Sequence, residues 1–275
     1  MALVLLPLLF VVAASFSDPD AVITGKVWFW PVGPNIEAYK MIFKNADIIN
    51  GYRNTIVYTL VGTGVNLVLT ICAAYPLSRR EFAGRNVFIM LMVFTMYFDG
   101  GLIPTFLNVR NLRLIDSMWA LILPVAVSTF NIIITRTFFV NAIPNELHEA
   151  ATIDGSSHIR TLLTIVMPLS KPVLAVITLY YAVSHWNSYF SALLYINTRT
   201  KFPLQIILRE ILVLRLMPER IAMTRQDMLS HSEQLKRGEL LKYAVIVAAN
   251  LPVLMIYPMI QKYFVQGVMI GSIKG

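Results

Sequence analysis

The sequence predicts an all-α, polytopic membrane protein with about six transmembrane helices in a single domain covering residues 1–275. Of its 275 residues, 57% are hydrophobic and 14% are charged, and the mean hydropathy is +0.65. An ordinary soluble domain is about 45–50% apolar and about 25% charged, so a soluble globular fold is excluded. Because a backbone inside lipid must satisfy its own hydrogen bonds, each long apolar run is expected to be a helix.

Six apolar runs are expected to span the membrane: 1–16, 54–78, 86–106, 117–139, 172–195 and 241–261. The first has no Lys or Arg ahead of it, which fits a cleavable signal peptide poorly, so we expect it to form the outer part of a first membrane helix. In the third, Asp99, Gly100, Gly101 and Pro104 predict a break. Such a break either lines a pathway or ends the helix at the membrane surface.

Basic residues in the short loops predict the orientation, because such residues favour the cytoplasmic side. The loop after the second span carries Arg79, Arg80 and Arg85 against Glu81 alone, so we expect it to be cytoplasmic. Counting spans from this loop places 17–53 and 196–240 outside, and 140–171 and both termini on the cytoplasmic side of the membrane.

Several classes of function are not favoured by the residue pattern. The formal net charge is +8, but the basic residues are spread over many loops, which does not suit nucleic acid. The four histidines are scattered and Cys72 is alone, so no metal site is expected. There is no Gly-rich Lys-Ser/Thr loop of the kind that holds nucleotide phosphates, so this chain is not expected to bind ATP. A membrane enzyme would need intramembrane acids, which the spans lack unless Asp99 or Asp116 lies deep.

Residues 140–171 predict two short helices joined by a tight corner. Asn145 after Pro144 is a good N-cap, and Gly155 is a C-terminal stop. Ser156 or Ser157 can cap a second helix, whose buried face is expected to contain four apolar residues at helical spacing: Ile159, Leu162, Leu163 and Val166.

The first of these helices has the pattern of a docking surface. Small Ala150 and Ala151 allow close approach of a partner, while the neighbouring Glu149 carboxylate can reach a cation. Glu and Ala are also simply good helix formers, so the triplet alone would mean little. Gly155, Ile165 and Pro168 follow it at fixed spacing.

Together these residues resemble the EAA loop of the permease subunits of bacterial ABC importers, with Met167 where the family favours Leu. The segments WALILP, HWNSYF and QKYFVQGVMIGSIKG extend the resemblance to MalG-like carbohydrate permeases, from about residue 50 onward. Within these, the chain is similar to the oligosaccharide and polysaccharide branch, which includes LplC-type and alginate permeases.

The resemblance implies a coupling helix at 146–154 that moves with a partner ATPase. The ATPase-coupling set it assigns is Glu149, Ala150, Ala151, Asp154, Gly155, Ile165 and Pro168. It also implies partners: a second, homologous permease, two copies of an ATP-binding subunit that binds ATP and Mg, an extracytoplasmic solute-binding protein, membrane lipid and a carbohydrate substrate. That substrate is expected to be an oligosaccharide or polysaccharide fragment, and an acidic one such as alginate is the alternative that the basic loop 203–240 would suit. Solvation of charged loop residues is the more common explanation of that basic excess.

Polar residues within the spans are candidates for the substrate pathway, because such groups usually face a bundle interior or a cavity. The set is Tyr181, His185, Asn187 and Asn131. The alternative is that these side chains only make contacts between helices or lie at the interface. The cargo also stays open, because an EAA loop reports coupling and says little about the solute: a polyamine or phosphate importer is the alternative.

Overall fold

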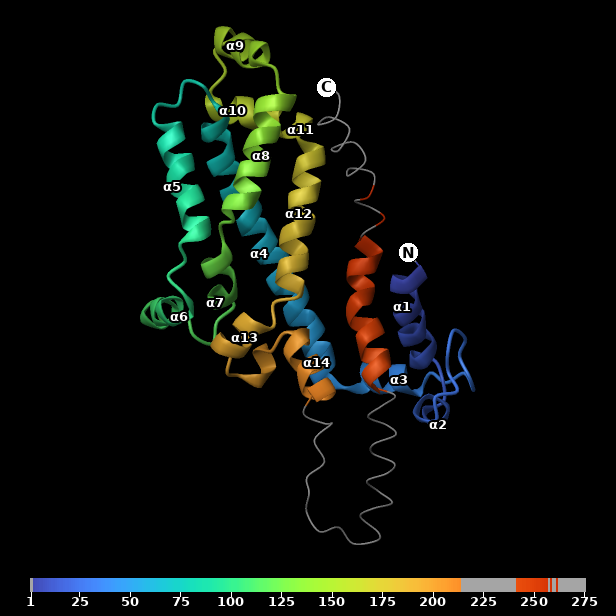
Figure 1. Ribbon diagram of the computed structural model, residues 1–275. Coiled ribbons are helices and arrows are strands. Elements are labelled where there is room, and N and C mark those ends of the chain that lie inside the picture. The colour runs from blue at the N-terminus through green and yellow to red at the C-terminus, as the bar shows by residue number, and fades with distance from the viewer. Residues whose placement is uncertain (1, 214–240, 257, 259–260, 262–275) are drawn as a thin grey trace. The chain divides into compact units, whose positions relative to one another are not determined.

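The computed structural model describes residues 2–213 and 241–256, together with 258 and 261. Every regular element in these residues is helical, which agrees with the predicted all-α class (Figure 1). The chain divides into two compact units, each described by itself below. The first contains residues 1–55 and 196–255, and the second contains 56–195 and 256–275.

The longest helix is α4 (Ala46–Ser78), whose 33 residues form the one uninterrupted helix that is long and apolar enough to cross a membrane among the described residues. Its length at 1.5 Å per residue is about 50 Å, more than the roughly 30 Å of hydrocarbon in a bilayer. It begins at Ala46, before the predicted span 54–78, because the Asn45 Oδ1 accepts hydrogen bonds from the backbone N–H groups of Asp47 (3.0 Å) and Ile48 (3.3 Å).

Three further membrane candidates are bent pairs of helices, each of which can form one broken span. They overlap the predicted spans 86–106, 117–139 and 172–195, whose limits stay predictions. Helices α5 (Arg85–Tyr97) and α6 (Leu102–Asn111) meet at 110°, which confirms the break expected from the Gly and Pro residues there. The segment α7–η1 (Trp119–Ile122 and Leu123–Val125) meets α8 (Thr129–Ala142) at 55°, beside Pro124.

The third bent pair joins residues 158–169 to α12 (Lys171–Trp186) at 85°. Its first arm consists of α10 (His158–Thr161), the π-helical segment η2 (Leu162–Val166) and α11 (Met167–Leu169). Helix α12 ends at Trp186, and α13 (Phe190–Tyr195) follows. The described residues thus hold up to four spans, whereas α1 (Ala2–Ser15) and the helix at 241–256 are shorter apolar helices. The count of six, and the single domain, stay predictions.

The first unit also contains α2 (Pro19–Ile23), α3 (Glu37–Lys44), η3 (Arg199–Lys201) and α14 (Leu204–Val213). The start of α4 packs closely on α14, where the Thr55 hydroxyl accepts the Leu204 backbone N–H at 2.8 Å. A methyl group on Gly51 would lie 3.1 Å from the Leu204 Cα and closer still to Ile207. A glycine is therefore required at this contact between helices.

The second unit has its tightest core where α4, α8 and η2 meet. Val166 is fully buried there, Ile132 is 1% exposed, and Tyr75, Phe139 and Ile143 complete the contact. Farther along, Val173, Ile177 and Tyr181 of α12 form a second buried cluster. These two clusters hold α4, α8 and α12 side by side, as Figure 1 shows.

Candidate functional site

The segment with the docking pattern forms helix α9 (Asn145–Ile153). Pro144 is its N-cap, so Asn145 is the first helical residue and not the cap as predicted. The helix ends at Ile153 with Asp154 as its C-cap, and Gly155 follows as the expected stop, with a φ of 70° in the left-handed region that glycine adopts without strain. The Ser156 backbone N–H returns to the Ala151 carbonyl at 2.9 Å and closes the corner.

The two faces of α9 differ in what they offer a partner. His148 and Ala151 are buried against the rest of the chain, at 7% and 5% exposure. Glu149 and Ala150 lie on the exposed side, together with Ile153, which is 86% exposed. Of the predicted Glu-Ala-Ala triplet, two residues are therefore open to a docking protein, while Ala151 allows close packing within this chain.

The rest of the predicted coupling set lies on the corner and the second helical segment. Asp154 and Pro168 are exposed and Ile165 is half-buried. The predicted buried face of this segment is wrong for Ile159 and Leu163, which are 71% and 56% exposed. Leu163 lies in the π-helical turn η2, whose wider winding departs from the 3.6-residue period on which the prediction rested. Ile159 precedes that turn and lines the surface pocket described below.

One aromatic contact joins α9 to α4. The imidazole of His148 and the ring of Tyr75 have centroids 6.3 Å apart and are tilted by 47°. His148 is the only large side chain that α9 buries, so this contact is the main side-chain link between the two helices. Burial, and next the positive charge of Arg79, lower the pKa of His148 below its ordinary value, while Glu81 acts weakly in the opposite direction.

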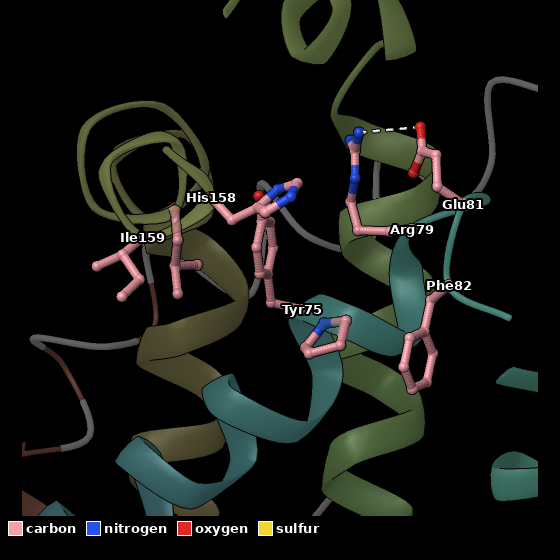
Figure 2. A pocket seen from close by; sticks show the side chains of 8 residues that line it. Tyr75, Arg79, Glu81, Phe82, His158 and Ile159 are labelled. Carbon is pink, nitrogen blue, oxygen red and sulfur yellow. Dashed lines mark hydrogen bonds and ion pairs between the residues drawn. The ribbon is translucent and has the colours of Figure 1, made fainter. Parts of the chain in front are cut away.

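A pocket of about 430 Å³ lies beside this contact (Figure 2). Its walls are mainly apolar, and the Arg79–Glu81 ion pair at 3.2 Å stands at its edge. The pocket is formed by the C-terminal end of α4, the following loop and the second helical segment: Tyr75, Pro76, Arg79, Glu81, Phe82, His158, Ile159 and Leu162.

The second part of the site is a polar cluster in the middle of the apolar run of α4. The Asn66 Nδ2 donates to the carbonyls of Val125 (2.7 Å) and Ala126 (2.8 Å), which the break between η1 and α8 leaves without helical partners. The Asn66 Oδ1 accepts a hydrogen bond of 2.6 Å from His185 Nε2, which fixes the tautomer of that imidazole. Asn66 is fully buried, so its amide joins α4, the broken helix and α12.

Neighbouring contacts along the same face of α4 reinforce this cluster. The hydroxyls of Thr70 and Tyr181 share a hydrogen bond of 2.7 Å. A methyl group on Gly62 would lie 2.5 Å from the His185 ring, so the imidazole packs directly on the helix backbone there. Positions 62, 66 and 70 are one helical turn apart and form a continuous seam against α12.

A pocket of about 300 Å³ opens beside the seam and is lined by Pro124, Val125, Val127, Ser128, Asn131, Tyr180, Tyr181, Ser184 and His185. The structure thus brings together three of the four predicted pathway residues, Asn131, Tyr181 and His185. Asn187 is exposed at the end of α12 and lies outside the lining. Sequence reasoning missed Ser128, whose only signal is its place as the N-cap of α8 after a proline-containing turn.

With this geometry established, the comparisons define the class of protein. Residues 48–270 match the family described as "Binding-protein-dependent transport system inner membrane component", and the chain belongs to that family. It is a permease subunit of an ABC importer, a transport component of the inner membrane and not an enzyme, and ATP is hydrolysed by a separate subunit. The family works with a partner permease, an ATPase and a solute-binding protein in general.

Several known proteins are similar to this chain along nearly their whole length. Protein LplC of Bacillus subtilis (strain 168) is 42% identical over 274 residues, covering 100% of this chain and 90% of that protein. The polygalacturonan/rhamnogalacturonan transport system permease protein YtcP of the same organism is 42% identical, covering 98% and 92%. A chain in the crystal structure of a bacterial ABC transporter involved in the import of the acidic polysaccharide alginate is 34% identical, with a TM-score of 0.84 over 95% of this chain and 91% of that one.

Replacing Asn66 by Leu is expected to destabilise the protein by about 1–3 kcal/mol, because it strands the carbonyls of Val125 and Ala126 away from water. The measurement is unfolding of the assembled importer in detergent, followed by loss of helical signal. Asn250→Leu is the matched control, since Asn250 is exposed and its amide donates to the Ile246 carbonyl of its own helix. Equal losses in the two variants would contradict the role of Asn66.

Acidification is expected to loosen α9. The pKa of His148 is lower in the folded protein than its ordinary value of about 6.5, so folding favours the neutral imidazole. The stability that this imidazole gives to α9 is therefore fully present at pH values above about 6.5 and is lost as the pH falls below that value. Amide hydrogen exchange of residues 145–153, corrected for intrinsic rates, should therefore rise between about pH 7.5 and about pH 5.5. His148→Gln should remove this rise, whereas His158→Gln, at an exposed histidine, should keep it. A rise that persists in His148→Gln would refute the assignment.

Proposed function

We propose that this chain is one of two different permeases in an importer of oligosaccharides derived from acidic polysaccharides. The observation that carries the proposal is the similarity to YtcP and to the alginate transporter, whose names both specify acidic polysaccharides, over more than nine-tenths of this chain. A polyamine or phosphate importer is not favoured by these relatives. The pocket beside Asn66 supports the proposal, because hydroxyl, amide and imidazole groups next to aromatic rings suit a sugar.

Coupling is proposed to run through the exposed face of α9. Glu149 would pair with a basic side chain of the ATPase, and Ala150 would allow its backbone to approach closely. Gly155 supplies the corner, while Asp154, Ile165 and Pro168 shape the adjoining surface. Two ATPase copies would bind ATP and Mg and close together, swinging the helices so that the cavity between them opens alternately to the two sides. No bond is made or broken in this chain.

The proposed orientation places α9 and both termini in the cytoplasm. The support is the arginine-rich loop that follows α4, which the positive-inside rule assigns to that side. The basic loop 203–240 would suit an acidic cargo, with solvated loop charge as the more common explanation, but residues 214–240 lie outside the described residues. In the part that is described, Arg199 pairs with Asp47 (2.8 Å) and Glu210 (3.3 Å), so its charge is already neutralised within the chain.

The test is uptake by the importer reconstituted in vesicles with its ATPase, partner permease and solute-binding protein. We expect ATP-dependent accumulation of oligogalacturonides, and no competition by spermidine or inorganic phosphate. Glu149→Lys should leave membrane insertion intact but weaken ATPase association about tenfold or more, because it replaces a charge-assisted contact by a repulsive one.

Glu37→Lys is the control for this variant, since Glu37 is an exposed carboxylate in the first turn of another helix. Unchanged association and uptake in Glu149→Lys would remove the coupling role of α9. Competition by spermidine or phosphate, with no binding of oligogalacturonides, would instead overturn the carbohydrate assignment and leave the coupling role standing.

A further inference from the structure

A short aromatic loop in the first unit points its side chains outward. Trp28 is 70% exposed, Phe29 is 49% exposed and Trp30 is 81% exposed, whereas the preceding Val27 is buried at 3%. Large aromatic side chains carry much apolar surface, and three in a row without cover would be costly in water. The site described above uses none of them.

Backbone hydrogen bonds tie this loop to the end of α1. The Asp18 N–H donates to the Val32 carbonyl at 2.9 Å, and the Val32 N–H donates to the Ser17 hydroxyl at 3.1 Å. The Asn35 N–H donates to the Phe16 carbonyl at 2.8 Å. The aromatic residues are thereby held beside residues 16–18.

That end of α1 is where the chain leaves the hydrocarbon layer. Residues 2–16 contain no charged side chain, and Asp18, Asp20 and Lys26 follow directly. Leu8, Val12 and Phe16 lie four residues apart on one face of α1 and are 58%, 45% and 37% exposed, so an apolar stripe leads up the helix to the loop. The level of residues 16–18 is therefore that of the lipid headgroups.

We propose that Trp28, Phe29 and Trp30 form a lipid anchor that lies in the headgroup region of the bilayer and fixes the depth of α1. Tryptophan is favoured at this level because its ring is apolar while its indole N–H can donate a hydrogen bond to headgroups or water. The inference depends on membrane location and not on the cargo.

A sugar and the solute-binding protein are two alternative partners that an exposed aromatic loop could bind. The hydrogen bonds to α1 favour lipid over both, because they hold the side chains at the bilayer surface beside an apolar helix face. The Trp28 and Phe29 rings are also tilted by 52° at a centroid distance of 6.4 Å, so they do not present one flat stacking surface.

Tryptophan fluorescence tests the anchor directly. The assembled importer is reconstituted in vesicles with phosphatidylcholine that carries a nitroxide in the headgroup, near the glycerol backbone or near the acyl-chain end. The double variant Trp28→Phe/Trp30→Phe is measured in parallel, because phenylalanine keeps the apolar bulk. The fluorescence of the original protein minus that of the double variant is the signal of Trp28 and Trp30. Trp119→Phe is the matched control, because subtracting its fluorescence in the same way gives the signal of a tryptophan outside the loop.

We expect the loop signal to be quenched severalfold more strongly by the two shallow labels than by the deep one, and only weakly by aqueous iodide. Full quenching by iodide with none by labelled lipid would overturn the proposal. Protection that arises only after the solute-binding protein or an oligosaccharide is added would also overturn it, because the loop would then be a surface for that partner.

Discussion

The structure depends on how Asn66 satisfies backbone carbonyls that a broken helix leaves free inside the membrane. The break between η1 and α8 would be costly in lipid, where no water can replace the missing hydrogen bonds. One buried amide supplies both donors, and its oxygen holds His185 of α12. A proline-containing turn can therefore lie at this depth and line a pocket, because a side chain of α4 completes its hydrogen bonding.

Helix α4 connects the two parts of the candidate site. Tyr75 contacts His148 of α9 near one end of α4, and Asn66 lies nine residues earlier, about 14 Å away along the axis at 1.5 Å per residue. The helix is continuous between these residues, so a displacement of its end carries the polar cluster with it. Docking at α9 can thus affect the pocket through one rigid helix, α4. The Tyr75–His148 contact lies at one end of this route and the Asn66 cluster lies at the other.

Local features of this fold were predictable, and distant pairings were not. The apolar runs, the glycine corner at Gly155 and the break near Gly101 follow from short-range rules of solvation and backbone geometry, so the sequence predicts them. The partners of Asn66 and His148 come from other helices, and no periodicity connects them. The predicted burial of Leu163 was wrong because this residue lies in a π-helical turn, which the 3.6-residue periodicity of the sequence does not indicate.

A double-mutant cycle at His148 and Tyr75 tests the central claim most directly, with uptake per ATP hydrolysed as the measured quantity in the reconstituted importer. If the contact between α9 and α4 transmits docking to the pocket, His148→Ala and Tyr75→Ala each lower this ratio while ATPase association is kept, and the double variant is no worse than either. Losses that simply add, or a ratio that stays at its original value, would contradict the account and place the transmission elsewhere.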